Sequence, residues 1–159
     1  MMKSLVIVYS YHHHNTEKIA QVIAHVIDAP VKKPDEVNPE EISEYGLVGF
    51  GSGIYYGRHH ESLLSLADRL HKVSSGTVFL FSTAALTGDE KISKDHSLLR
   101  EKLQSKGYVI AGEFGCKGFN TNSFLKYFGG MNKGRPNAED LHRAEEFALS
   151  LKKDYLTEK

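Results

Sequence analysis

The stretch that decides the fold runs from Leu5 to Ala20 and reads LVIVYSYHHHNTEKIA. Its apolar, largely β-branched beginning predicts a buried strand over Lys3–Tyr9. Polar residues follow from Ser10, and apolar residues then recur at helical spacing, which predicts a helix over Thr16–Val26. A polar loop that opens into a helix presents backbone N–H groups without intrahelical acceptors. Such a loop suits a phosphate.

Strand and helix patterns alternate along the rest of the chain. Apolar runs predict strands at a short, proline-flanked edge segment and at three longer segments: Pro30–Pro34, Leu47–Gly53, Thr77–Phe81 and Tyr108–Phe114. Helical spacing predicts three further helices: Glu61–Leu70, Ser93–Lys106 and Ala138–Lys153. Asn38–Ile42 has the pattern of a capped helical turn with proline at its first position.

This alternation predicts an α/β fold, in which helices cover both faces of a parallel sheet. No repeat or linker interrupts residues 1–159, so we expect one domain. In such sheets a ligand binds beyond the carboxyl ends of the strands. Four loops should lie there: the first loop (Ser10–Thr16), the second loop (Ser52–His60), the third loop (Ser82–Asp89) and the long fourth loop (Gly115–Arg135).

Composition narrows the class of protein. Hydrophobic residues make up 40% of the chain, and twenty basic residues balance twenty acidic ones. Balanced charge gives no reason to expect nucleic acid as a partner, and no apolar run is long enough for insertion into a membrane. The single cysteine, Cys116, permits no internal disulfide and is expected to pack in the interior. We therefore expect a cytoplasmic protein.

The first loop carries the strongest signal for a ligand. Ser10, three histidines, Asn15 and Thr16 are all donors suited to an anion. In the alternative interpretation, Asn15 or Thr16 caps the helix and the histidines are incidental. No metal is expected, because adjacent loop residues rarely converge on one ion and the loop has no carboxylate or thiol.

The second and third loops carry weaker signals. Glycines and tyrosines of the second loop suit a flat ring, although a surface loop would have the same composition. The small third loop leaves backbone N–H groups that can donate to a heterocycle. Four residues are candidate substrate contacts, although each is more typical of a solvated surface: Arg58, His59, His60 and Lys133.

The chain resembles the flavodoxin family over essentially its whole length. Four segments carry the resemblance: Asn15-Thr16 with Ala20, GSGIYYGR at 51–58, Phe81-Ser82-Thr83, and GGMNKGRPN at 129–137. The resemblance implies a flavodoxin-like three-layer α/β/α sandwich with a five-stranded parallel sheet in the order 2-1-3-4-5. It also implies non-covalently bound FMN and electron transfer to redox protein partners or a small quinone-like acceptor.

The resemblance also implies cofactor-binding positions. The FMN phosphate would be held by residues of the first loop: Ser10, His12, His13, His14, Asn15 and Thr16. The isoalloxazine ring would be lined by residues of the second and third loops: Ser52, Gly53, Ile54, Tyr55, Tyr56, Gly57, Ser82, Thr83, Ala84 and Ala85. Adjacent residues point to opposite sides, so only one tyrosine should stack on the ring, and we favour Tyr55. A carrier of this kind needs no catalytic residue.

The first loop departs from the family pattern. Ser/Thr-x-Thr-Gly-Asn-Thr is usual, whereas His13 and His14 here replace Thr-Gly. The turn must therefore form with a side chain in place of glycine, and protonated imidazoles could support the phosphate.

Two other functions are alternatives for this chain, and two further classes of protein are excluded by the residues present. An FMN-dependent NAD(P)H:quinone reductase or a protoporphyrinogen-oxidase-like enzyme is the alternative on the same fold, with the fourth loop shaping a pocket. A binding module without flavin is a further alternative. A receiver domain lacks its acidic cluster here, and a low-molecular-weight phosphatase lacks its first-loop cysteine.

Overall fold

The computed structural model describes residues 3–11, 14–118 and 134–156. The strands are β1 (Ser4–Tyr9), β2 (Val31–Lys32), β3 (Leu47–Tyr55), β4 (Arg58–His59), β5 (Gly76–Ala84) and β6 (Tyr108–Lys117). The helices are α1 (Asn15–Ile27), α2 (Glu61–Arg69), α3 (Asp89–Ser105) and α4 (Ala138–Leu151). Shorter helical segments are η2 (Pro34–Glu36), η3 (Pro39–Glu44) and η5 (Lys152–Leu156). His12, His13 and most of the fourth loop lie outside the described residues.

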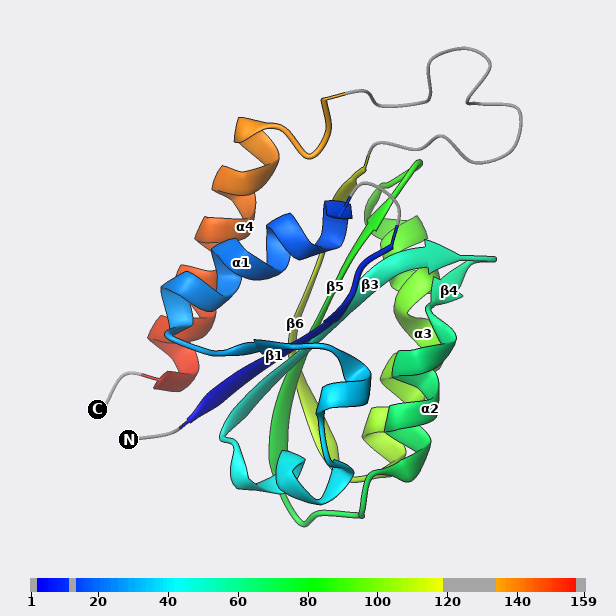
Figure 1. Cartoon of the computed structure of the whole chain (residues 1–159), viewed down its shortest axis with the longest axis vertical. Coiled ribbons are helices and arrows are strands. Elements are labelled where there is room, and N and C mark those ends of the chain that lie inside the picture. Colours follow the sequence, from blue (N-terminus) through cyan, green and yellow to red (C-terminus); the bar gives the residue numbers. More distant parts are fainter. Residues whose placement is uncertain (1–2, 12–13, 119–133, 157–159) are drawn as a thin grey trace.

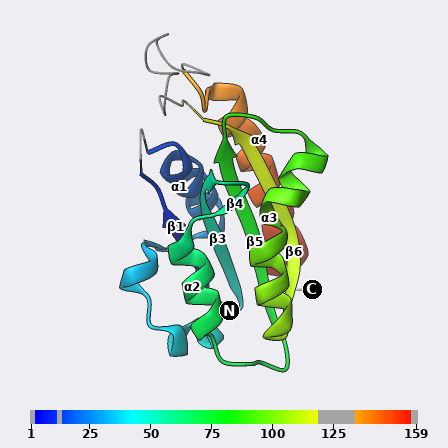
Figure 2. The ribbon, with the colours of Figure 1, turned by 90° about the vertical axis from the view of Figure 1, so that its right-hand side faces the viewer.

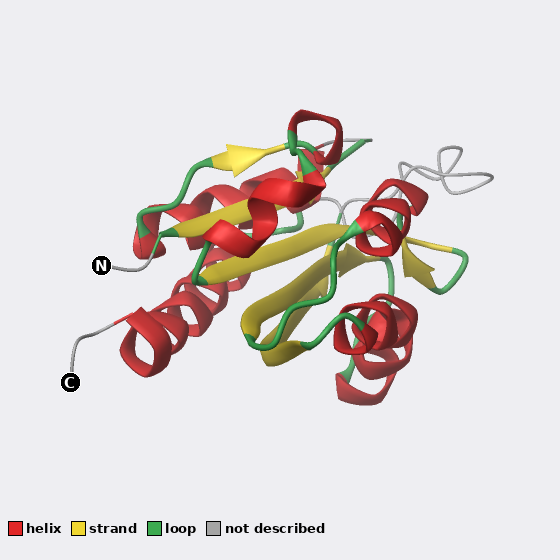
Figure 3. Ribbon diagram, turned by 90° about the horizontal axis from the view of Figure 1, so that it is seen from below, coloured by secondary structure: helices red, strands yellow, loops and turns green. Residues whose placement is uncertain are grey.

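The fold is a three-layer α/β/α sandwich around a parallel sheet. Strands β2-β1-β3-β5-β6 lie side by side in that order, which is the predicted 2-1-3-4-5 order of parallel strands. Helices α1 and α4 cover one face, and α2 and α3 cover the other (Figures 1 and 3). Strand β6 forms an edge and runs between α3 and α4 (Figure 2).

The sequence did not predict the hairpin of β3 and β4. Strand β3 continues to Tyr55, and β4 pairs with it in antiparallel register. Tyr56 and Gly57 form the turn between them, both at positive φ (54° and 77°), as two-residue hairpin turns of type I′ require. The second loop is therefore largely a hairpin rather than a loop.

The core consists of two apolar layers, one on each face of the sheet. Alternate residues of the strands contribute to opposite layers, because side chains alternate along a strand. On β5, Leu80 packs toward α2 and α3, whereas Phe79 and Phe81 pack toward α1 and α4. Glycines of β3 make room for these rings, since a Cβ at Gly51 would lie 2.1 Å from the ring of Phe81. These layers pack the helices against both faces of the sheet.

Helix boundaries differ from prediction where polar residues begin or end a helix. Helix α3 begins at Asp89, four residues before its first expected residue, with acidic residues in its first turn. Such residues stabilise a helix N-terminus but give no apolar periodicity. The turn at Asn38 is confirmed, because its side chain accepts from the Glu40 N–H at 3.1 Å. None of the helices among the described residues combines the length and the apolar character that crossing a membrane requires.

Candidate functional site

The first, second and third loops meet at the carboxyl edge of the sheet, where α1 begins (Figure 1). A buried hydroxyl pair joins the first loop to the third, because Thr16 Oγ1 lies 2.8 Å from Thr83 Oγ1. Only 1% of Thr16 and 4% of Thr83 is exposed. The predicted phosphate loop and part of the predicted ring site are thus brought together.

The first loop caps α1 in a way that the sequence did not predict. The helix begins at Asn15, and the capping residue is His14, whose side chain makes no capping hydrogen bond. The alternative interpretation, in which Asn15 or Thr16 caps the helix, is therefore wrong. Ser10 takes that role instead, because its Oγ accepts from the Glu17 N–H at 3.3 Å. The Ser10 hydroxyl hydrogen remains available to donate to a ligand.

His14 occupies the position where the family pattern has glycine. Its φ is 52°, in the left-handed region that glycine adopts most easily. The turn therefore forms with a side chain present, as predicted. The ring is exposed, and its Nδ1 lies 3.0 Å from Glu17 Oε2.

The second loop is anchored at its base by Ser52. This buried hydroxyl donates to the Gly53 carbonyl oxygen at 2.6 Å and accepts from the His60 N–H at 3.0 Å. Gly53 and Ile54 lie in β3 itself. Ser52 therefore holds the hairpin rather than facing the loops.

The two tyrosines of the hairpin differ in environment. Tyr56 projects from the turn into solvent, fully exposed. Tyr55 is half-buried, and its ring meets the edge of His60 at a centroid distance of 5.1 Å. Burial, with Tyr9 and Tyr11 nearby, raises the pKa of Tyr55. Tyr55 thus belongs to an aromatic cluster at the end of β1, where Tyr9 stacks on His60 at 3.7 Å.

The third loop begins with neighbours that point to opposite faces. Thr83 contacts α1, whereas the Ser82 hydroxyl lies 2.7 Å from His96 Nε2 on α3. Ser82 was predicted to line the isoalloxazine ring, but its side chain points toward α3, on the face of the sheet that α2 and α3 cover. Ala84 and Ala85 are partly buried, and the Ala84 carbonyl accepts from the Gly118 N–H at 3.0 Å.

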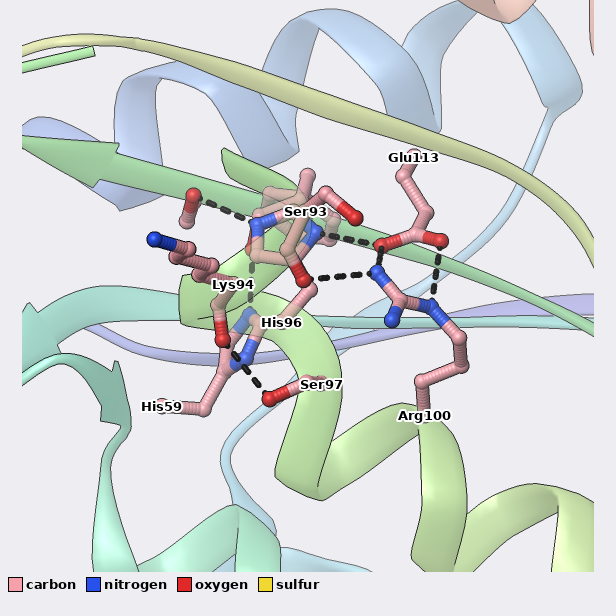
Figure 4. Close-up of polar contacts among 9 residues, drawn as sticks. His59, Ser93, Lys94, His96, Ser97, Arg100 and Glu113 are labelled. Carbon is pink, nitrogen blue, oxygen red and sulfur yellow. Dashed lines mark hydrogen bonds and ion pairs between the residues drawn. The ribbon is translucent and has the colours of Figure 1, made fainter. Parts of the chain in front are cut away.

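A polar network that the sequence did not predict continues from Ser82. His96 Nδ1 lies 2.9 Å from Glu113, and Arg100 donates twice to the same carboxylate at 2.8 Å (Figure 4). Burial opposes ionisation of Glu113, but the hydrogen bonds from His96 and Arg100 outweigh it and lower its pKa to about 2. The only sequence signal was that His96 shares the inner face of α3 with Leu99 and Leu103.

His59 lies beside this network and not on the surface. It is 1% exposed, and its Nε2 donates to the Phe81 carbonyl at 3.0 Å. Its ring centroid is 4.6 Å from that of His96. Burial and the neighbouring His96 lower the pKa of His59 to about 3. The sequence-based view of His59 as a solvated residue is wrong, whereas Arg58 is exposed as expected.

Two cavities flank these loops. One of about 610 Å³ lies beside the first loop, and Ser10, His14 and Lys32 are among the residues that line it. Another, of about 400 Å³, lies between α3 and α4, with Glu113 and Arg100 in its wall. Cys116 is buried as predicted, and burial raises its pKa to about 12.

Comparison with known proteins identifies the family. Residues 6–120 match the family model described as a flavodoxin domain. The chain belongs to the flavodoxin family. An uncharacterized protein of Methanocaldococcus jannaschii is 46% identical to it over 153 residues, which are 96% of this chain and 100% of that protein.

Solved flavodoxins share the fold at low identity. Oxidised flavodoxin 2 from Bacillus cereus is 18% identical, with a TM-score of 0.72 over 96% of this chain and 99% of that one. A Fusobacterium nucleatum flavodoxin mutant bound to flavin mononucleotide is 15% identical, with a TM-score of 0.65 over 98% of both chains. Family and fold together support a flavodoxin-like role with a flavin cofactor.

Proposed function

We propose that this flavodoxin-family chain binds FMN non-covalently at the carboxyl edge of its sheet and carries electrons. One observation carries the proposal. The first loop turns through His14 into α1 with Ser10 bound to the Glu17 amide, at the point where the family pattern places its phosphate loop. A helix N-terminus with nearby hydroxyl donors favours a phosphate. The Fusobacterium nucleatum flavodoxin bound to FMN supports the same cofactor here.

The phosphate would be held by neutral donors in the described part of the first loop. Ser10 keeps a hydrogen to donate, and Asn15 and Thr16 stand in the first turn of α1. His12 and His13 are proposed to add donors or, when protonated, positive charge. No lysine or arginine occurs between residues 10 and 16.

The ring would lie between the hairpin and the third loop. Tyr55 is the proposed stacking residue, since it is half-buried while Tyr56 points into solvent. Backbone groups of Thr83, Ala84 and Ala85 would face the polar edge of the ring. Bound flavin supplies electron transfer in one- or two-electron steps, and the chain supplies binding, orientation and electrostatic environment. Redox proteins, or a small quinone-like acceptor, are the proposed partners.

The phosphate assignment is tested by comparing FMN with riboflavin. Flavin fluorescence, titrated with apoprotein, gives the dissociation constant of each. Losing one hydrogen bond to a charged group should weaken binding of FMN to Ser10→Ala roughly tenfold to a hundredfold. Riboflavin, which lacks the phosphate, should bind Ser10→Ala and the parent equally. Ser43→Ala is the matched control, because Ser43 is exposed on η3.

Unchanged affinity of Ser10→Ala for FMN would show that the Ser10 hydroxyl does not hold the phosphate. The electron-carrier assignment has a separate test. Purified protein with bound flavin should exchange electrons with a reduced redox protein, but should not consume NADH or NADPH with a quinone in repeated turnovers. Sustained consumption of NADH or NADPH with a quinone would show that the protein is an FMN-dependent reductase and not an electron carrier.

A further inference from the structure

The buried network on the α2/α3 face has defined donors and acceptors (Figure 4). Arg100 donates to both carboxylate oxygens of Glu113, and His96 Nδ1 faces Oε1 of the same carboxylate at 2.9 Å. Because an ionised carboxylate only accepts, Nδ1 carries a hydrogen. The opposite ring nitrogen, Nε2, faces Ser82 Oγ at 2.7 Å.

In this geometry the imidazole ring of His96 can accept a second proton without any movement of heavy atoms. In the neutral ring, Ser82 donates its hydroxyl hydrogen to Nε2. In the protonated ring, Nε2–H donates to Ser82 Oγ, and the hydroxyl rotates. His96 is fully buried, so both states depend on these two partners.

The charges around His96 balance one another. On α3, Arg100 pairs with Glu113 of β6, and the half-exposed Lys91 pairs with the buried Asp95. On β4, His59 stays neutral, because burial holds its pKa at about 3 and its Nε2 donates to the Phe81 carbonyl. Among these groups only His96 combines a carboxylate partner with a second, adaptable hydroxyl partner. An added proton is therefore best placed on His96.

Ser82 also connects the imidazole ring of His96 to the proposed cofactor site. It immediately precedes Thr83, which the proposed function places beside the flavin ring, and it is itself buried. Negative charge that appears on a ring at this edge would act through a poorly screened interior. Glu113, 24% exposed at its side chain, lies in the wall of the 400 Å³ cavity and gives the network a solvent-facing end.

We propose that His96 takes up a proton when the bound flavin is reduced, an inference that rests on the proposed function. An external reductant supplies the electron, which adds one negative charge to the ring. One proton from solvent adds to Nε2 of His96 and forms an N–H bond, so the net charge of the site does not change. Ser82 then switches from donor to acceptor.

Reciprocity gives the measurable size of this coupling. If reduction favours protonation of His96, protonation of His96 favours reduction by the same factor. For two unit charges in the protein interior, we expect a factor of roughly tenfold in the protonation equilibrium of His96.

The direct test is NMR of the histidine ring nitrogens in the flavin-bound protein, before and after reduction with dithionite. The proposal expects His96 Nε2 to gain a hydrogen on reduction. His142 is the internal control, because its Nε2 pairs with Glu146 at 2.8 Å on the exposed side of α4. His142 should show no change with redox state. An identical His96 spectrum in both states overturns the proposal.

Glu113→Gln gives a second, independent readout. Removing the charge while keeping the shape should reduce the dependence of the midpoint potential on pH, whereas Glu146→Gln should leave it as in the parent. Equal pH dependence in parent and Glu113→Gln overturns the proposal. If Glu113→Gln does not fold, the NMR comparison on the parent decides. Failure to bind flavin overturns the proposed function as well, whereas flavin binding with an unresponsive His96 overturns only this inference.

Discussion

Two adjacent residues at the end of β5 lie in opposite environments. Thr83 points toward α1 and makes a neutral hydroxyl pair with Thr16, whereas Ser82 points toward α3 and joins a network with Glu113 and Arg100. Because side chains alternate along a strand, one strand end serves both faces. The Thr83 side ties two loops together without charge. The Ser82 side contains ionised groups, so pH and charge substitutions should affect it far more.

The largest effect on stability is expected on the Ser82 side, at Glu113. Glu113→Ala leaves His96 without its carboxylate partner and Arg100 half-buried without a counter-charge, which should lower the free energy of unfolding by about 3 kcal/mol. Glu146→Ala removes an equivalent histidine partner at an exposed pair, and should cost about 0.5 kcal/mol or less. Urea unfolding of both variants measures the difference. Equal losses would mean that the network adds nothing to stability.

Acid should lower the stability of the protein through groups on the same face of the sheet, which α2 and α3 cover. The pKa of His59 is lowered to about 3 in the folded chain, so the unfolded chain binds more protons as pH falls below the ordinary histidine value. Its contribution is present at neutral pH and is lost on acidification, by about 2 kcal/mol at about pH 5. Glu113, with a lowered pKa of about 2, acts in the same direction at lower pH.

His59→Gln isolates the histidine contribution, because glutamine can still donate to the Phe81 carbonyl. Its stability should fall less than that of the parent between about pH 7 and pH 5, measured by urea unfolding at each pH. His25→Gln, at an exposed position of α1, should retain the parent's dependence. A parallel fall in parent and His59→Gln would contradict a neutral, buried His59.

The Thr83 side should respond to loss of a partner rather than to charge. Thr16→Val leaves the buried Thr83 hydroxyl without its partner, which should cost about 1–2 kcal/mol. Thr16→Val combined with Thr83→Val replaces both hydroxyls by groups of similar shape and should recover part of that loss. Thermal unfolding of the three proteins gives the coupling. Strictly additive losses would show that the two hydroxyls do not interact.

The sequence predicted the strands and the first loop because both depend on local patterns, whereas the strand order came from the resemblance to the flavodoxin family. Apolar runs marked the five parallel strands, and the polar residues after Tyr9 marked the start of α1. The hairpin was missed because Tyr56-Gly57 lacks the usual Asn-Gly signal and β4 has only two residues. The network was missed because Ser82, His96 and Glu113 are distant in sequence and meet only when α3 packs on the sheet.

A smaller effect is expected in the turn before α1. His14 holds a positive φ that favours glycine, so His14→Gly should relieve strain of about 1 kcal/mol. Loss of the exposed contact with Glu17 offsets part of that gain. The expected net change is therefore a small rise in the midpoint of thermal unfolding. A clear fall would show that the His14 ring has a structural role in the loop.

The lone thiol on the α1/α4 face should be inert. Cys116 is 1% exposed, and burial together with nearby Asp140 raises its pKa to about 12. Since the thiolate is the reactive form, a disulfide reagent should label the native protein only as fast as the protein unfolds. The protein unfolded in guanidinium is the control and should react at once. Rapid labelling of the native protein would contradict the packed position.

The central claim is that the first loop holds the phosphate of a mononucleotide flavin. The most direct measurement is the absorption spectrum of the untagged protein as purified, followed by chromatography of the cofactor released with acid. We expect a yellow protein whose released cofactor elutes as FMN at about one per chain, because the sequence has one predicted phosphate loop and no G-x-G-x-x-G after Tyr9. Release of FAD, or a colourless protein that does not take up added FMN, would contradict the claim.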